Sequence, residues 1–332
     1  MALWQYRRRQ LIRRRIFLGT VLFLLSVILV RYFIPSDSTV KIREDTHKIA
    51  LFDHLSGQVV ELGLEEYVVG VVAAEMPASF HPEALKAQAV AARTYAVKRL
   101  QLPDPRVKAL HPQADLSTDH TINQAWISDA EMRKRWGKWN YAAYKKKIIE
   151  AVEETWGLVM LYEGQLIDPV YHASCGGKGT ENSGDVWKYH VPYLQRVECS
   201  GHPENNHEAV VTMSLNDFIA KMGVQPQVPA GKIFGNAKVL QITERTESGR
   251  VKNLVFGGQS FTGAELRSKL DLKSTLIVGW EIEGSTVKFS TLGYGHGVGM
   301  CQYGAGAMAE AGHDFRQILS HYYQGVTLGR IK

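Results

Sequence analysis

The chain has 332 residues, of which 45% are hydrophobic and 22% are charged. These proportions are typical of a folded globular protein, so disorder, collagen and coiled coil are excluded as descriptions of the whole chain. Three cysteines are too few for a small domain framed by disulfides. The length allows about two domains or one large domain.

The basic character of the chain is confined to its N-terminus. The net charge of +6 is the excess of 39 Lys and Arg residues over 33 Asp and Glu residues. Six of the basic residues have no acidic residue before them: Arg7, Arg8, Arg9, Arg13, Arg14 and Arg15. The remaining sequence carries 33 basic and 33 acidic residues. Since a nucleic-acid-binding domain carries its basic excess on the folded surface, we expect no nucleic-acid partner.

An apolar segment over residues 16–34 follows the arginines. Residues 16–30 (IFLGTVLFLLSVILV) are uncharged, and Arg31 can extend its side chain to a membrane surface. A spanning helix needs about 20 apolar residues. A cleaved signal peptide has the same basic start, but the small residues of a cleavage site do not follow here. We therefore expect an uncleaved transmembrane anchor rather than a cleaved signal or a buried helix.

The anchor sets the expected organisation of the rest of the chain. By the positive-inside rule, residues 1–15 form a cytoplasmic tail. Residues 35–48 are polar and form a tether. Residues 49–332 form an extracytoplasmic domain of one or two lobes. The sequence thus predicts a single-pass protein of the cell membrane with its N-terminus in the cytoplasm.

After the tether, the sequence predicts a hairpin and two helices. The hairpin strands are Ile49–His54 and Gln58–Leu62, and a helix over Leu64–Glu75 follows. This helix ends before Pro77, because the residue before a proline disfavours helical backbone angles. A second helix over Pro82–Leu100 has proline in its first turn and is rich in alanine, so another element can approach it closely.

The middle of the chain is predicted to be a loop, a helix and a second hairpin. Residues 101–128 contain prolines and histidines and are expected to form a long loop. A helix over Tyr141–Trp156 is stopped by a glycine. The strands Leu158–Tyr162 and Gln165–Tyr171 pair across a Glu-Gly turn, and a stretch rich in glycine, serine and asparagine comes next.

The C-terminal part adds more hairpins and helices. In chain order they are a helix over Ser214–Met222, strands Lys238–Glu244 and Val251–Phe256, a capping box at Thr262–Glu265 before another helix, strands Leu276–Ile282 and Thr286–Leu292, and two helices separated by Gly312. Hairpins and helices are mixed without regular βαβ alternation. The predicted fold class is therefore α+β, with antiparallel hairpins.

Glu75 is the first candidate for chemistry. It ends an apolar helix, where a carboxylate faces the negative end of the helix dipole among apolar neighbours. Both effects disfavour the charged form and raise the pKa of the carboxyl, which suits a general acid near neutral pH. The competing interpretation is a solvated glutamate at a frayed helix end.

Further polar candidates lie on the alanine-rich helix and on two glycine-rich loops. Gln88 needs a partner if buried, and Arg93 is expected either to pair with a carboxylate or to hold ligand hydroxyls. The candidates in the loops are Lys178, Glu181 and Asn182 in the first, and His296 and Tyr303 in the second. Alternating glycines in the second loop permit positive φ and close backbone approach. The competing interpretations are a surface arginine and ordinary turn-rich loops.

The cysteines leave three interpretations open. Outside the cytoplasm, Cys175 and Cys199 can form a disulfide or remain free thiols. They can also bind zinc, since His172-x2-Cys175 and Cys199-x2-His202 have zinc-like spacing. In each case we expect these cysteines to stabilise the domain and to take no part in catalysis.

Several stretches of the chain resemble the stage II sporulation protein D (SpoIID) family, whose domain is shared by amidase enhancers. They are LEEYVVGVVAAEMPASFHPEALKAQAVAARTYAV (64–97), GGKGTENSGDVW (176–187), PYLQRV (192–197), GYGHGVGMCQYGA (293–305) and the ending HYYQGV (321–326). The resemblance covers nearly all of the chain after the anchor. It implies an α+β catalytic domain, unlike lysozyme, that cleaves peptidoglycan glycan strands during engulfment of the forespore.

The resemblance implies a lytic transglycosylase whose catalytic glutamate is Glu75, within AAEMP. Such an enzyme protonates the glycosidic oxygen between N-acetylmuramic acid and N-acetylglucosamine, and the conjugate base then deprotonates the 6-hydroxyl to close a 1,6-anhydro ring. This chemistry needs one carboxyl, no cofactor and no metal. The residues expected to bind the sugars are Arg93, Gln88, Lys178, Glu181, Asn182, His296 and Tyr303. One departure is Cys301, where family members often carry serine, which argues against a nucleophilic thiol.

The resemblance also implies partners and a rival function. The expected partners are glycan strands stripped of stem peptides, the cytoplasmic membrane, an amidase-endopeptidase and a polytopic membrane protein of the engulfment machinery. The expected location is the mother-cell membrane facing the forespore. The main alternative is a non-enzymatic, wall-binding activator of an N-acetylmuramoyl-L-alanine amidase. A purely structural sporulation scaffold is the third interpretation.

Overall fold

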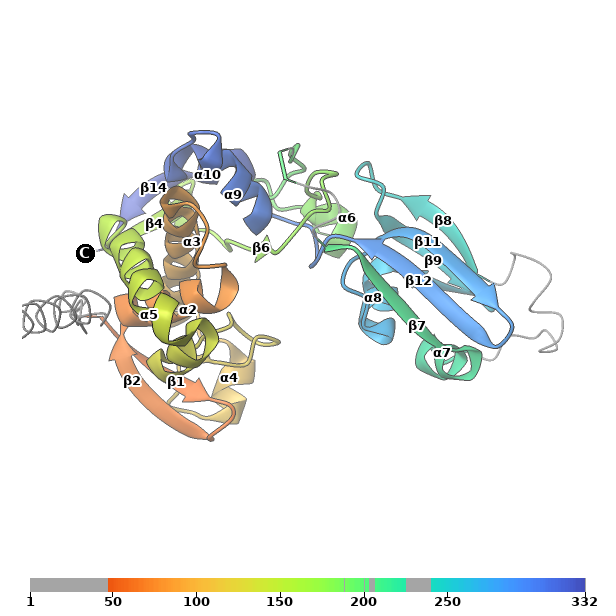
Figure 1. Cartoon of the computed structure of the whole chain (residues 1–332), viewed down its shortest axis with the longest axis horizontal. Helices are drawn as coiled ribbons and strands as arrows, with labels where there is room; N and C mark the ends of the chain where they lie inside the picture. The colour runs from red at the N-terminus through yellow and green to blue at the C-terminus, as the bar shows by residue number, and fades with distance from the viewer. Residues whose placement is uncertain (1–46, 188, 200, 203–206, 225–239, 332) are drawn as a thin grey trace, which may run out of the picture.

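A computed structural model of the chain describes residues 47–187, 189–199, 201–202, 207–224 and 240–331. The expected cytoplasmic tail, the membrane anchor and most of the tether lie outside these residues. Within the described ranges, no helix has the length and apolar character needed to cross a membrane. The described residues form two lobes joined by extended segments (Figure 1).

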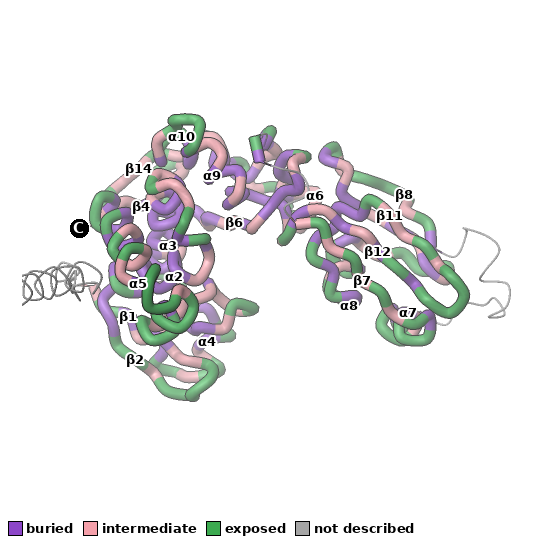
Figure 2. Tube along the Cα trace, in the orientation of Figure 1, coloured by how far each residue is buried: buried purple, intermediate pink, exposed green. Residues whose placement is uncertain are grey.

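The first lobe is centred on an alanine-rich helix. This helix, α3 (Pro82–Gln101), contacts four others: α2 (Leu64–Glu75), α5 (Asp129–Glu154), α9 (Gln302–Glu310) and α10 (Phe315–Tyr322). The alanines of α3 at positions 84, 87, 89, 91, 92 and 96 are completely buried. Small side chains let the neighbouring helices approach closely, as the sequence predicts. Figure 2 shows the buried residues gathered along α2 and α3.

Two small sheets complete the first lobe. One has the strand order β2-β1-β3 and contains β1 (Lys48–Asp53), β2 (Gln58–Gly63) and β3 (Leu116–Ser117). The other has the order β14-β4-β5 and contains β14 (Thr327–Arg330), β4 (Leu158–Tyr162) and β5 (Gln165–Leu166). The two predicted hairpins, β1–β2 and β4–β5, are both antiparallel.

The structure corrects two predictions in the middle of the chain. Residues 101–128 are not a bare loop, since they include β3 and the short helix α4 (Pro105–Leu110). Helix α5 starts at Asp129 rather than Tyr141, because Ser128 and Glu131 form a capping box. The non-helical Gly137, at φ 68°, interrupts the helix and divides the sequence pattern.

The second lobe has its own sheets and its own hydrophobic core. Its two sheets have the orders β11-β12-β7 and β10-β9-β8. Its elements are β7 (Ala209–Ser214), α7 (Leu215–Met222), β8 (Leu240–Arg245), β9 (Val251–Phe256), β10 (Gln259–Thr262), α8 (Gly263–Leu270), β11 (Leu276–Glu283) and β12 (Thr286–Leu292). Phe218, Phe256 and Phe289 meet at the centre of this core, which is separate from that of the first lobe.

The chain leaves the first lobe and returns to it through two short strands that pair in parallel. These are β6 (Tyr171–His172) and β13 (Met300–Cys301), with Met300 opposite Tyr171. The predicted strand over 165–171 is therefore wrong as one element, because Pro169 separates β5 from β6. Helix α6 (Ser183–Trp187) lies between the lobes in Figure 1. Helices mixed with mainly antiparallel sheets confirm the predicted α+β class.

Candidate functional site

A pocket of about 650 Å³ opens beside the C-terminal end of α2. Its walls come from the last turn of α2, the loop over residues 120–125, strand β6 and residues 294–296 of the second glycine-rich loop. Arg267 of α8 reaches it from the second lobe. Glu75 is the only carboxylate among the lining residues, all of which belong to the described part of the chain.

The end of helix α2 fixes the backbone of Glu75. The buried residues of α2 pack against α3 and α5. Met76 then becomes extended, at φ −120° and ψ 141°, and its N–H still donates to the carbonyl of Val72 at 3.1 Å. Glu75 Oε1 accepts a hydrogen bond of 2.9 Å from the backbone N–H of Ala125. The carboxyl is therefore half-buried and held, not frayed into solvent.

Burial raises the pKa of Glu75 above its ordinary value, as the sequence predicts. The Ala125 N–H, the Tyr171 hydroxyl and the charges of His120 and Arg135 act in the opposite direction but do not overcome it. Arg135 also donates to the carbonyl oxygens of Ala73 and Ala74, at 2.8 and 3.1 Å. This guanidinium opposes the negative end of the α2 dipole. Desolvation is the largest cause of the raised pKa of Glu75.

A chain of hydrogen bonds supports the Tyr171 hydroxyl beside Glu75. The Tyr67 hydroxyl donates to Gln124 Oε1 at 3.3 Å, and Gln124 Nε2 donates to the Tyr171 oxygen at 2.8 Å. Since that oxygen already accepts a hydrogen bond, the Tyr171 proton is free to point at Glu75. Asn123 in the same loop donates to the Tyr95 hydroxyl at 2.8 Å.

The loop that carries Ala125 is seated on α2 by a tryptophan over a glycine. The Trp126 ring lies against Gly70, where an added Cβ would be only 2.1 Å from the indole nitrogen. The Ile127 N–H also donates to the Gly70 carbonyl at 3.3 Å. A side chain at position 70 would displace this loop and, with it, the donor to Glu75.

Two histidines, His172 and His296, form part of the pocket wall. The rings of His172 and His296 are 5.7 Å apart. His296 Nδ1 accepts a hydrogen bond from Val298 N–H at 3.1 Å, and burial together with Arg267 and Arg250 lowers the pKa of His296 to about 4. Burial also lowers the pKa of His172. Both imidazoles are therefore neutral near pH 7.

The glycines of the second loop let it pack against β6. All four alternating glycines, at positions 293, 295, 297 and 299, have positive φ, as predicted. A Cβ on Gly295 would lie 2.7 Å from the Cβ of His172, and one on Gly299 would lie 2.1 Å from the carbonyl oxygen of Val170. Close backbone approach thus brings His296 next to His172.

The two candidates on α3 lie behind the pocket. Arg93 and Glu65 form a fully buried ion pair, with nitrogen–oxygen distances of 2.5 and 2.7 Å. Of the two roles expected for Arg93, this is the pairing with a carboxylate. The Arg93 guanidinium is not among the residues that line the pocket. Gln88 accepts a hydrogen bond of 3.1 Å from Gln302, which does line the pocket. Gln88 therefore lies one residue away from the pocket.

The loop candidates separate into different environments. Glu181 is buried, and Oε1 lies 3.4 Å from Arg250 Nε and accepts hydrogen bonds from Thr246 and Ser248. Lys178 is exposed, and Asn182 bonds the Arg196 backbone N–H and the Asp185 carboxylate. The Tyr303 ring packs edge-on against Phe80 and His207. Of the seven predicted sugar-binding residues, the pocket lining includes only His296.

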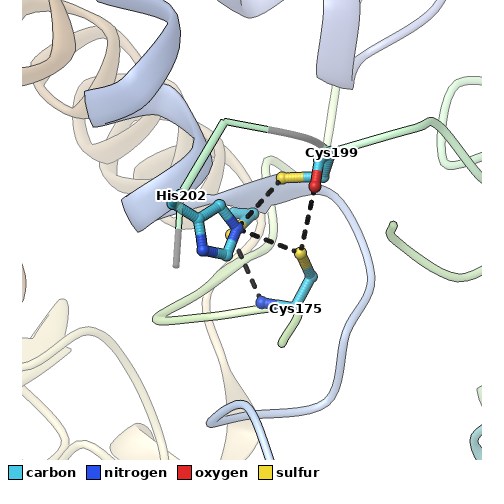
Figure 3. A group of neighbouring side chains, drawn as sticks. Cys175, Cys199 and His202 are labelled. Carbon is cyan, nitrogen blue, oxygen red and sulfur yellow. Dashed lines mark hydrogen bonds between the residues drawn. The ribbon is translucent and has the colours of Figure 1, made fainter. Parts of the chain in front are cut away.

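The cysteines do not form a disulfide, which removes one of the three interpretations. Cys175, Cys199 and Cys301 are all free and buried. They surround the imidazole of His202, as Figure 3 shows for Cys175 and Cys199. These four side chains are the group that could hold a metal among the described residues. His172, named in the zinc-like spacing, faces the pocket instead.

Several residues of the pocket have no signal in a single sequence. Asn123, Gln124 and Ala125 lie in the predicted loop, Tyr171 ends a predicted strand, and Arg135 lies outside the predicted elements. The one sequence feature that could have indicated these residues is the amide pair Asn123-Gln124 shortly before Trp126. The contact of this loop with Glu75, through the backbone N–H of Ala125, joins residues 50 positions apart, which a single sequence does not indicate.

Comparisons with known proteins identify the family of this chain. The family model "Stage II sporulation protein" matches residues 53–162. Stage II sporulation protein D of Bacillus subtilis is 38% identical over 281 residues, covering 84% of this chain and 78% of that protein. Its counterpart in Bacillus amyloliquefaciens is 38% identical over 289 residues, covering 86% and 80%. The amidase enhancer of Bacillus subtilis is 31% identical over 312 residues, covering 78% of this chain and 40% of that protein. The chain belongs to the stage II sporulation protein D family.

Proposed function

We propose that this protein is a peptidoglycan lytic transglycosylase with Glu75 as its only general acid and base. The observation that carries the proposal is a single carboxyl of raised pKa in a pocket otherwise lined by neutral and basic side chains. A raised pKa increases the protonated fraction of a carboxyl at a given pH, and the protonated form can donate its proton to a leaving group. Hydrolytic glycosidases use a pair of carboxyls, whereas this lining offers one.

One carboxyl is sufficient for the proposed reaction. Protonated Glu75 gives its proton to the glycosidic oxygen between N-acetylmuramic acid and N-acetylglucosamine, and the bond to the muramic anomeric carbon breaks. The Glu75 carboxylate then takes the proton of the muramic 6-hydroxyl, whose oxygen bonds to the same carbon. The products are a 1,6-anhydro end and a free N-acetylglucosamine hydroxyl, and Glu75 is protonated again.

The surroundings of Glu75 suit both proton transfers. The Ala125 N–H holds Oε1, and the Tyr171 hydroxyl stabilises the carboxylate that forms after the first transfer. His172 Nδ1 lies 3.1 Å from the carbonyl oxygen of Val298. A carbonyl oxygen can only accept a hydrogen bond, so Nδ1 is the protonated nitrogen of this ring. His172 Nε2 then carries no proton and is an acceptor for a sugar hydroxyl; it is buried without a partner among the described residues.

The substrate is proposed to be a glycan strand stripped of stem peptides. His296, His172 and Gln302, which Gln88 supports, would contact the sugars beside Glu75. Lys178, Asn182 and Tyr303 remain proposed contacts for more distant sugars. For Arg93 and Glu181, the buried ion pairs support a role in holding the fold instead. Membrane anchoring through residues 16–34 and action during engulfment, with an amidase-endopeptidase and a polytopic membrane protein, belong to the same proposal.

The product identifies the reaction. Full-length protein in detergent is incubated with denuded glycan strands, and the fragments are analysed by mass spectrometry. We expect fragments ending in 1,6-anhydro-N-acetylmuramic acid, which are lighter by one water than products of hydrolysis. Fragments with reducing N-acetylmuramic acid ends would contradict the transglycosylase mechanism, and intact strands would contradict any glycan-cleaving activity.

The second candidate is activation of an amidase, which the similarity to an amidase enhancer supports. The two functions are separated by adding the protein to an N-acetylmuramoyl-L-alanine amidase on intact peptidoglycan. An increase in free stem peptides that persists in Glu75→Gln, without anhydro ends from the wild type, would favour the activator. Anhydro ends without any increase in stem peptides would favour the transglycosylase alone.

A further inference from the structure

Four buried side chains turn their metal-ligating atoms toward one point, away from the Glu75 pocket. They are Cys175, Cys199, His202 and Cys301, and their ligand atoms all lie within 4.8 Å of one another. The distances from His202 Nε2 to the three sulfur atoms are 3.3, 3.5 and 3.7 Å. In Figure 3 the imidazole edge faces the sulfur atoms of Cys175 and Cys199.

These distances match the edges of a tetrahedron around zinc. Structural zinc sites have bonds of about 2.3 Å to sulfur and about 2.0–2.1 Å to histidine nitrogen, which give ligand–ligand edges of about 3.5–3.8 Å. Three thiolates with one imidazole are a ligand set typical of structural zinc. With four protein ligands, such a site has no open position for substrate or water.

A disulfide explains the cluster less well. It would require a sulfur–sulfur bond of about 2.05 Å, and all three cysteines are free. A disulfide between any two of the cysteines would also leave the burial of the third thiol beside the imidazole unexplained. Zinc accounts for all four side chains at once.

The surroundings of the sulfur atoms suit thiolates. Cys301 Sγ accepts hydrogen bonds of 3.3 Å from the backbone N–H groups of Cys175 and Gly304. Cys301 is also the N-cap of α9, so the positive end of that helix faces the sulfur. The Tyr322 hydroxyl lies 3.2 Å from Cys199 Sγ. Donors of this kind stabilise the negative charge of metal-bound sulfur.

We propose that Cys175, Cys199, His202 and Cys301 bind one structural zinc ion. The ion ties together the segment after β6, Cys199 and His202, and the start of α9. Cys175 follows strand β6, which carries His172, and Cys301 lies in β13, which follows the glycine-rich loop that carries His296. If the proposed function is right, zinc keeps that wall in place for glycan binding and takes no part in proton transfer at Glu75.

Metal content tests the site without any assay of activity. The full-length protein is purified in detergent without chelators, and its metals are measured by mass spectrometry. We expect one zinc per chain in the wild type and loss of most of it in Cys301→Ser and His202→Ala. His313→Ala, at an exposed histidine, and His172→Gln, in the pocket wall, should retain it. Retention by folded Cys301→Ser, or loss from His172→Gln, would overturn this ligand set.

A second measurement decides the case if the ligand variants do not fold. Wild-type protein is stripped of metal under reducing conditions and reloaded with Co²⁺. We expect thiolate-to-cobalt charge-transfer absorption with the visible bands of tetrahedral cobalt, and a melting temperature that Zn²⁺ restores and Mg²⁺ does not. Wild-type protein that is metal-free, lighter by two hydrogens and indifferent to both ions would contain a disulfide, and the zinc site would be wrong. None of these readouts depends on glycan cleavage, so they stand or fall separately from the proposed function.

Discussion

Among the side chains around Glu75, Tyr171 offers the most direct way to change the pKa of the acid by substitution. Its hydroxyl lowers the pKa of Glu75, against the larger effect of burial. Tyr171→Phe should therefore raise the pKa of Glu75 further. Because the reaction needs protonated Glu75, the alkaline limb of the pH profile of kcat/KM should move to higher pH. The maximal rate should fall, since the carboxylate formed in the reaction loses a donor.

Tyr323→Phe is the matched control for this prediction. Its hydroxyl is also buried and donates to the carbonyl of Val170 at 2.9 Å, but it does not line the pocket. We expect a loss of about 1 kcal/mol of stability and no shift of the alkaline limb. An unchanged limb in Tyr171→Phe would mean that Glu75 is not the titrating group.

At this scale, the sequence predicts the acid but not its neighbours. Glu75 is recognisable because an apolar helix, a following Met-Pro and a glutamate are adjacent in the chain. The hydrogen bonds of Ala125 and Tyr171 come from segments 50 residues or more away, which carry no periodic pattern. For Arg93, the residue type leaves two roles open, and only the packing of Glu65 beside it decides between them.

Helix α2 and the loop over residues 120–127 act as one unit through Gly70 and Trp126. Gly70→Ala would place a methyl group in steric clash with the indole ring of Trp126. Overpacking of this kind costs about 1–3 kcal/mol, which exceeds the gain of up to about 1 kcal/mol from replacing a helical glycine. We expect a lower free energy of unfolding in urea and a reduced kcat, because the loop carries the Ala125 N–H away from Glu75.

A double variant checks that the effect passes through the tryptophan. Trp126→Ala alone should destabilise the protein by opening a cavity. In the double variant Gly70→Ala/Trp126→Ala, the added methyl should cost much less than it does in the wild type. Additive losses would show that Gly70 acts elsewhere on α2.

Elements with local signals are predictable and those made by long-range contacts are not. The end of helix α2 follows from Pro77, and the capping box before α8 follows from a threonine and a glutamate three residues apart. The start of α5 escapes prediction because Gly137 breaks its pattern. The parallel pairing of β6 with β13 joins two-residue strands across more than a hundred residues, which no periodicity can indicate.

The two lobes are held together at a buried ion pair. Glu181 comes from the segment that joins the lobes, and Arg250 precedes β9 of the second lobe. Arg250 also donates to the carbonyl of Cys175 at 2.9 Å and to Ser274 at 2.7 Å. Arg250→Ala should lower the free energy of unfolding by about 3–5 kcal/mol, because Glu181 would remain buried without its partner.

The double variant Arg250→Met/Glu181→Gln separates the effect of the unpaired Glu181 charge from the effect of lost packing. Removing both charges should recover part of the stability lost in Arg250→Ala, as measured by urea unfolding. Equal losses in the two variants would mean that packing, and not the ion pair, holds the lobes.

The most direct test of the whole mechanism is the rate at which Glu75→Gln releases 1,6-anhydro-N-acetylmuramic acid ends from denuded glycan. Glutamine keeps the shape of the side chain but cannot donate the proton, so we expect a loss of at least about 10²–10⁴-fold, with folding and glycan binding retained. Glu66→Gln is the matched control, since Glu66 is exposed on the same helix; Glu65 is unsuitable because it pairs with Arg93. A folded Glu75→Gln that releases anhydro ends at the wild-type rate, as Glu66→Gln should, would contradict the single-acid mechanism.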